Sequence, residues 1–226
     1  PKDLADWEEL DRDRNVLAHE LVHSWNGKFR RSARLWTPDY RQPMQDNLLW
    51  VYEGQTQFWG FILAARSGLQ AKETVLGALA MQAGKYAEQA GREWRSVEDT
   101  THDPIFADRK PKPYTSLARG EDYYNEGALI WLEADQTIRA GTGGRKGLDD
   151  FARAFFAHPG TRDGRQATYG FDDVVFVLNA VYPSDWAGFL RKRRNRHTAA
   201  KRGAGQRGIN SLVHFNPPIH RAIGGG

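Results

Sequence analysis

The 226-residue sequence contains no cysteine. This absence excludes disulfide bonds, zinc sites built from thiolates and a cysteine nucleophile. Any metal ion must therefore be held by histidine, aspartate or glutamate. The sequence also lacks a run of about 18 uncharged apolar residues, the length that a membrane-spanning helix needs. Its first residues, PKDLADWEELDRDR, are charged where a signal peptide is apolar. We therefore expect no membrane span and no export signal in the chain as given.

Acidic residues are missing from the end of the chain. From Trp186 onward there are nine lysines and arginines and no aspartate or glutamate, whereas the part before Trp186 has 23 basic and 28 acidic residues. Apolar periodicity fades after Leu190, so we expect residues 191–226 to form a flexible, basic Gly/Arg-rich tail. Nucleic-acid or other polyanion binding would have to depend on this tail alone. A solvated terminus is the simpler interpretation, and no specific nucleic-acid partner is expected.

Apolar residues follow the helical period along most of the chain, and strand-like alternation is scarce. The pattern predicts a mainly α-helical protein, with a long proline-rich loop at about 100–119 and two short helices capped by Asp172 and Ser184. The longer helices are expected at residues 15–26, 48–66, 71–89, 124–139 and 148–157.

The first predicted helix combines an apolar pattern with two histidines. Asn15 is expected to cap it, and its apolar residues are expected to face inward, namely Val16, Leu17, Leu21 and Trp25. His19 and His23, four residues apart, lie about 40° apart around a helix axis, so both imidazoles can bind one Zn²⁺. Glu20 lies beside that face and can take a proton from a water molecule whose pKa the zinc lowers. The alternative is a pair of surface histidines on an amphipathic helix.

A catalytic zinc ion usually has three protein ligands and one open position. Glu53 is the best candidate for the third ligand, because it is an acid in an otherwise apolar helix, where an unpaired carboxylate would be costly. The alternative is a structural ion pair between Glu53 and an arginine such as Arg30 or Arg34. A site with two histidines and one carboxylate can also accept Co²⁺, Mn²⁺ or Fe²⁺.

Three ordered motifs, HELVHSWN at 19–26, LLWVYEGQTQFWG at 48–60 and DYYNEGALIWLEADQTIR at 122–139, resemble the glycyl aminopeptidase family of gluzincin zinc metallopeptidases. The resemblance extends from about residue 15 to residue 190. It implies that residues 1–190 form the helical catalytic half of a thermolysin-like metallopeptidase domain, with the upstream β-rich region of the family missing. It also implies one zinc ion per chain, bound by His19, His23 and Glu53, with Glu20 as general base and proton shuttle.

The third motif suggests a further catalytic group. Tyr124, three residues before Gly127, matches a tyrosine that in related aminopeptidases donates a hydrogen bond to the tetrahedral oxyanion. The neighbouring Tyr123 leaves this assignment open between the two phenols. Where relatives often have lysine before the glycine, this chain has Glu126.

The resemblance implies a peptide substrate, cleaved near a free N-terminus with a preference for glycine or alanine. A zinc-binding but catalytically silent fragment is the alternative. Trp25 and Asn26, after the second histidine, are candidates either for substrate contact or for helix packing. The sequence does not predict an oligomeric state or a compartment. Further polar residues are candidates for orienting a ligand imidazole, namely Asp46, His102, Asp103 and Asp122.

Overall fold

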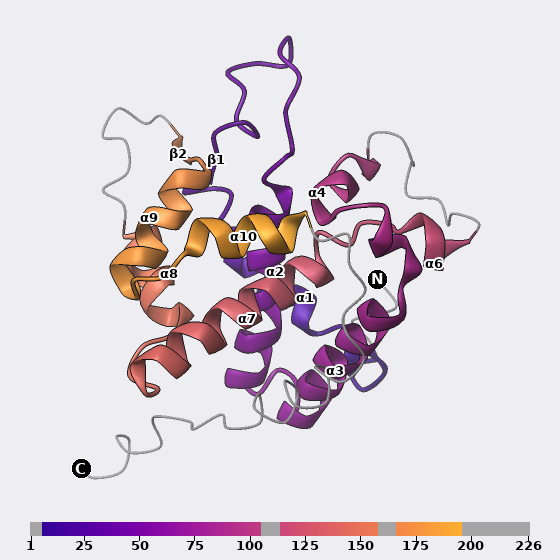
Figure 1. Cartoon of the computed structure of the whole chain (residues 1–226). Coiled ribbons are helices and arrows are strands. Elements are labelled where there is room, and N and C mark those ends of the chain that lie inside the picture. The colour runs from indigo at the N-terminus through magenta and orange to yellow at the C-terminus, as the bar shows by residue number, and fades with distance from the viewer. Residues whose placement is uncertain (1–5, 105–113, 158–165, 196–226) are drawn as a thin grey trace.

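The computed structural model describes residues 6–104, 114–157 and 166–195, which form a helical domain with one small sheet (Figure 1). This confirms the mainly α-helical prediction. The elements are the 3₁₀ helices η2 (Glu9–Arg12) and η3 (Ala90–Glu93), the strands β1 (Arg30–Ser32) and β2 (Ala167–Tyr169), and the α-helices α1 (Asn15–Val22), α2 (Leu49–Arg66), α3 (Lys72–Glu88), α4 (Val97–Thr100), α6 (Thr115–Ala118), α7 (Asn125–Thr142), α8 (Leu148–Phe156), α9 (Phe171–Val181) and α10 (Trp186–Arg194).

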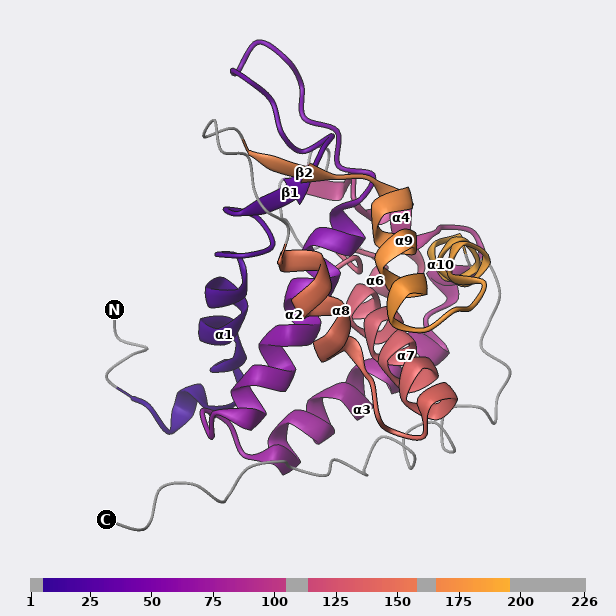
Figure 2. The ribbon, with the colours of Figure 1, turned by 90° about the vertical axis from the view of Figure 1, so that its left-hand side faces the viewer.

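Helix α2 runs through the centre of the domain and packs against α1 on one side and α7 on another (Figure 2). Two glycines make these crossings close. A Cβ atom at Gly54 would lie 2.7 Å from the Cα of Gly127 in α7, and a Cβ atom at Gly60 would lie 3.1 Å from the Cβ of His19 in α1. Glycine usually weakens a helix interior, but here one glycine lets α7 approach α2 closely and the other lets α1 do so.

Helix α1 faces the core with the side opposite to the predicted one. Its buried residues are Asn15, Ala18, His19 and Val22. The four apolar residues expected to face inward are 47–56% exposed, namely Val16, Leu17, Leu21 and Trp25. We call the exposed side of α1, with Val16, Leu17 and Leu21, the outer face of α1; Trp25 lies in the turn after this helix. The prediction was wrong because the close crossing at Gly60 and the contact with α2 set the rotation of α1, whereas apolar spacing does not. Figure 2 shows α1 at the edge of the domain.

The sheet is a parallel pair of short strands. Arg30 of β1 aligns with Ala167 of β2, and Ser32 aligns with Tyr169. Gln166 adds hydrogen bonds from its Nε2 to the carbonyl oxygens of Lys28 and Phe29, both at 2.8 Å. The pairing therefore fastens the segment after α1 to a distant part of the chain.

Helix α1 ends at Val22, before the predicted end at residue 26, whereas the other long helices begin and end close to the predicted positions. Helix α7 ends at Thr142, and Gly143, the residue after it, adopts a φ of 61°. The predicted caps at Asp172 and Ser184 were wrong. Helix α9 begins after Gly170, whose N–H donates to the carboxylate of Asp173, and α10 begins after Asp185, whose carboxylate accepts from the N–H of Gly188. In both places the aspartate that accepts a free N–H at the start of the helix is the residue directly after the predicted cap.

Helix α4 ends at Thr100, where the expected long loop begins, and α6 lies near the end of that loop. Residues 105–113, between them, lie outside the described part of the chain. Helix α10 continues past Leu190 to Arg194, where Arg193 pairs with Glu133 of α7 and Arg194 pairs with Glu98 of α4. The rest of the expected tail, residues 196–226, also lies outside the described residues. Among the helices described, none combines the length and the apolar character that crossing a membrane requires.

Candidate metal centre

The three predicted ligand side chains meet where α1 crosses α2. His19 and His23 project from one face of α1, and their Nε2 atoms are 3.1 Å apart. Glu53, from the second turn of α2, places its Oε2 atom 3.3 Å from each of these nitrogens. Among the residues that the structure describes, this is the only group of three or more histidine or acidic side chains arranged to hold a metal ion.

The three atoms are spaced as ligands of one small cation would be. Two atoms that bind zinc at about 2.0–2.1 Å in tetrahedral geometry are separated by about 3.3 Å. The measured separations of 3.1, 3.3 and 3.3 Å match this spacing. The Oε2 atom of Glu53 is buried and makes no well-formed hydrogen bond with any described residue. A buried carboxylate oxygen without a hydrogen bond is costly, and coordination of a cation would compensate it.

The charges of the three side chains influence one another. Burial by itself raises the pKa of Glu53, but the two imidazoles offset this effect, so that the pKa of the carboxyl lies below its ordinary value. Burial by itself lowers the pKa of His23, yet Glu53, the Asn26 carbonyl and the charge of Glu20 together raise it above the ordinary value. The carboxylate form that binds a cation is thus favoured at Glu53.

The alternative of an ion pair between Glu53 and Arg30 does not fit the structure. The guanidinium of Arg30 donates to the carbonyl oxygen of Phe155 at 2.7 Å and lies 4.2 Å above the ring of the same residue. Arg34 is exposed. Among the described residues, the ion pairs of Glu53 are those with the two histidines.

Asn26 holds the second histidine in place. The Nδ1 atom of His23 is 3.0 Å from the carbonyl oxygen of Asn26. The Asn26 side chain, which is completely buried, donates to the carbonyl oxygen of Tyr52 and accepts from the hydroxyl of Tyr169. The packing interpretation of Asn26 therefore fits, and this residue connects the turn after α1 to α2 and β2.

The other predicted orienting residues lie elsewhere and pair with different partners. Asp46 and His102 pair with each other, with Oδ1 and Nδ1 2.9 Å apart. Asp103 pairs with Arg95, and Asp122 pairs with Arg119. Sequence spacing could not separate these candidates from Asn26, because the group that contacts His23 is a backbone carbonyl, which any residue carries.

The two tyrosines before α7 have different surroundings. The ring of Tyr124 lies 5.9 Å from the ring of His19 and is half-buried. Tyr123 is buried in the core, where burial first and the neighbouring Tyr124 next raise the pKa of its phenol. Glu20, by contrast, is exposed on the solvent side of α1. A partly exposed phenol and an exposed carboxylate thus flank the three candidate ligands.

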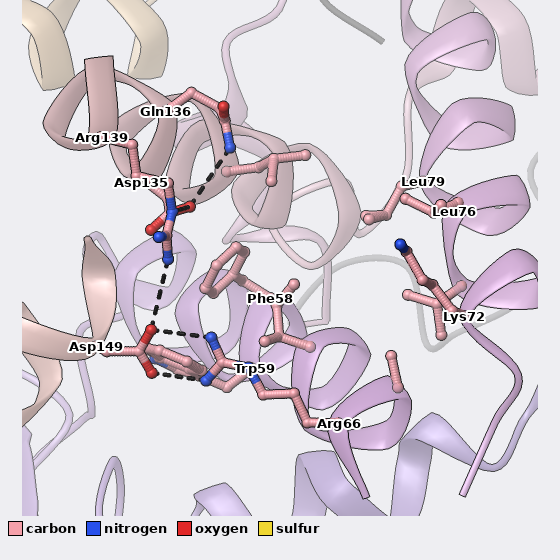
Figure 3. A pocket seen from close by; sticks show the side chains of 14 residues that line it. Phe58, Trp59, Arg66, Lys72, Leu76, Leu79, Asp135, Gln136, Arg139 and Asp149 are labelled. Carbon is pink, nitrogen blue, oxygen red and sulfur yellow. Dashed lines mark hydrogen bonds and ion pairs between the residues drawn. The ribbon is translucent and has the colours of Figure 1, made fainter. Parts of the chain in front are cut away.

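A pocket elsewhere in the domain is separate from this centre (Figure 3). It lies between α2, α3 and α7, with the apolar side chains of Phe58 and Leu79 in its wall. Ile62, which also lines it, follows Glu53 by nine residues and so points about 180° away from it around the axis of α2. Figure 3 shows Asp149 between Arg66 and Arg139 at the pocket edge.

Comparison with known proteins adds two similarities. Residues 12–130 match the sequence family described as M61 glycyl aminopeptidase. The fold is similar to that of an aminopeptidase N family protein from Idiomarina loihiensis, with a TM-score of 0.67 and 23% sequence identity. The similarity covers 82% of this chain and 31% of that one, so this chain spans about a third of the solved protein. No protein of curated function matches the sequence.

Proposed function

The chain belongs to the M61 glycyl aminopeptidase family, and from this premise we propose that residues 1–190 contain the catalytic centre of a zinc-dependent aminopeptidase. The proposed substrate is a peptide with a free N-terminus, preferentially glycine or alanine. The observation that carries the proposal is the set of three candidate ligand atoms, from His19, His23 and Glu53, spaced as zinc ligands are. One zinc ion per chain is proposed.

The ligand side chains have distinct tasks in this proposal. The two imidazoles and the Glu53 carboxylate hold the ion, and the Asn26 carbonyl keeps the His23 ring in the orientation that points Nε2 at the other ligands. When bound, zinc supplies a Lewis acid that polarises the peptide carbonyl and makes a water molecule more acidic.

Glu20 and Tyr124 are proposed as the groups that act on the substrate. Glu20, exposed beside the two histidines, takes the proton of the attacking water and delivers it to the leaving amine. The phenol of Tyr124, whose ring lies close to His19, donates a hydrogen bond to the oxygen on which negative charge develops. Tyr123 is less suited to this task because it is buried in the core.

Metal content and hydrolysis test the proposal when measured on the same samples. We expect one zinc per wild-type chain by elemental analysis, and hydrolysis of glycyl and alanyl anilides that a chelator abolishes. Glu53→Ala is expected to lose most of the zinc and the activity, because it removes one of three ligands. Glu20→Gln is expected to keep the zinc and lose the activity. Glu133→Ala, which removes a glutamate of α7 that pairs with Arg193, is the control and retains both.

The possible outcomes separate the alternatives. Zinc without hydrolysis in the wild type would favour a zinc-binding but catalytically silent chain. A folded wild type that binds no zinc would rule out the mechanism. Salt-sensitive polyanion binding that is lost when residues 191–226 are removed would assign a separate activity to the tail.

A further inference from the structure

A buried cluster of charged side chains lies beneath the N-terminus of α7. Glu126, in the first turn of this helix, is contacted by two arginines. Arg92 of η3 donates from Nε to Oε1 of Glu126 at 2.8 Å, and Arg119 contacts Oε2 through its NH2 group. All three side chains are buried. Each carboxylate oxygen of Glu126 is therefore held by a different arginine.

A second acid extends the cluster. Asp122 accepts a hydrogen bond from Nε of Arg119 at 2.9 Å and another from the hydroxyl of Tyr86 at 3.1 Å. Arg92 also donates to the carbonyl oxygen of Tyr86 at 2.6 Å. Two arginines thus face two carboxylates, with Lys85 3.8 Å from Asp122 on the more exposed side. Removal of one member of such a buried set leaves a charge without its partner, which is strongly destabilising to the local arrangement.

The cluster encloses the segment that carries Tyr124. Arg119 pairs with Asp122, which precedes Tyr124 in the chain, and with Glu126, which follows it. The carbonyl oxygen of Asp122 accepts from the N–H of Glu126 at 2.8 Å, which closes the turn that contains both tyrosines. Arg119 itself has a φ of 54°, in the left-handed region that a non-glycine residue seldom adopts. The surrounding contacts must therefore hold this segment against a conformational preference.

The same segment is also fixed from the side of α2. The carbonyl oxygen of Tyr123 would lie 2.9 Å from a Cβ atom at Gly54, the residue that follows Glu53. The turn is thus confined between α2, which carries a proposed zinc ligand, and the charged cluster. A displacement on the cluster side would move Tyr124 relative to His19, whose ring it approaches.

We propose that Glu126 is a positioning residue, which through Arg92 and Arg119 sets the Tyr124 phenol against the metal centre. This inference depends on the proposed function, since it assigns Glu126 to the same reaction. Glu126 does not touch the ligand atoms. It acts by fixing the turn from which Tyr124 extends.

A double-mutant cycle tests this role. Glu126→Gln keeps the shape of the side chain and removes its charge, and we expect kcat to fall about tenfold with KM within about twofold. Tyr124→Phe is expected to lower kcat about 100-fold, as loss of one oxyanion donor does. In the Tyr124→Phe background, Glu126→Gln should then change kcat by less than about twofold, because the group that it positions is already absent.

Asp135→Asn provides a matched control on the same helix. Asp135 is also buried and also accepts from an arginine, Nε of Arg139, as well as from the N–H of Leu148. It lies more than two turns further along α7. Its effect on kcat, of whatever size, should be the same in the wild-type and Tyr124→Phe backgrounds. If Glu126→Gln behaves in this additive way, the positioning role is wrong.

A spectroscopic measurement gives the same test without turnover. With 3-fluorotyrosine at position 124 of the full chain, Zn²⁺ alone should shift the fluorine resonance in the otherwise wild-type protein and in Asp135→Asn. The shift should be lost or reduced at least about twofold in Glu126→Gln while zinc content stays the same. An unchanged shift in Glu126→Gln, or no shift in a wild type that binds zinc, would overturn the inference. Absence of zinc from the wild type would instead overturn the proposed function and the inference with it.

Discussion

The inner face of α1 buries polar side chains beside apolar ones, whereas its outer face exposes apolar side chains to solvent. The inner face buries Asn15 and His19 together with Val22, whereas the outer face leaves Leu17 and Leu21 about half exposed. A helix on the edge of a soluble domain usually buries its apolar stripe. In α1, the side that turns inward is the one that crosses α2 closely at Gly60 and brings His19 and His23 to Glu53.

This difference teaches that burial and hydrophobicity are separate properties in a helix that carries candidate metal ligands. On the inner side, the Nε2 atom of His19 lies 3.3 Å from Glu53 of α2. In the turn after α1, the buried amide of Asn26 donates to the Tyr52 carbonyl. The valine and leucine side chains of the outer face carry no polar atoms that need a partner. The following predictions either break the close packing on the inner side or show how little the outer face contributes to folding.

The largest effect is expected from breaking the glycine crossing beside Glu53. A Cβ atom at Gly54 would lie 2.7 Å from the Cα of Gly127, and backbone atoms cannot move aside as a flexible side chain can. Gly54→Ala should lower the free energy of unfolding by about 3 kcal/mol, measured by urea denaturation. Gly77→Ala in α3, where no atom lies within 4 Å of the added carbon, should raise it by up to about 1 kcal/mol. Equal stabilities of the two variants would show that the crossing is not tight.

Two adjacent residues of α1 give the sharpest comparison of its faces. Val22 is 4% exposed and Leu21 is 56% exposed. Val22→Ala removes two buried methyl groups and leaves a small cavity, so it should cost about 2 kcal/mol of unfolding free energy. Leu21→Ala, although it removes more carbon atoms, should cost less than about 0.5 kcal/mol. A reversal of this order in thermal or urea unfolding would mean that the apolar face is the buried one.

The smallest effect is expected from making the outer face polar. The double variant Leu17→Gln with Leu21→Gln should change the free energy of unfolding by less than about 0.5 kcal/mol, because both side chains are already in contact with solvent. It should also bind less of the dye ANS, since exposed apolar area decreases. Zinc content should remain that of the wild type. Loss of zinc together with loss of stability would contradict the assignment of this face to the solvent side.

The sequence predicted most of the helix boundaries and the three candidate ligand residues. Helices could be located because glycine, proline and short polar residues interrupt a clear helical period, and the family prediction from three motifs is confirmed by the match over residues 12–130. Glu53 was identifiable because a carboxylate in an apolar helix needs a partner. The structure brings it to His19 and His23 as expected, whereas zinc binding itself stays a prediction.

Features that depend on distant partners could not be predicted. The rotation of α1 follows from Gly60, which the sequence pattern treats only as a weak point in a helix. Glu126 pairs with two arginines, Arg92 and Arg119. Both lie in segments without helical periodicity, and no local sequence pattern connects either of them with Glu126. The one available signal was the acid at a position where relatives often have lysine. A buried acid requires a counter-ion, and two buried arginines provide it here.

The parallel pairing of β1 with β2 sets an order of events during folding. Tyr169 donates its hydroxyl hydrogen to Asn26, 143 positions earlier in the chain. A chain emerges from the ribosome N-terminus first, at about 5–20 residues per second, so α1 is made well before the strand that fastens the turn behind it. Contacts of such long separation form late, because the loop between them must close before they stabilise anything. The turn that orients His23 is therefore completed only when the far end of the domain has arrived.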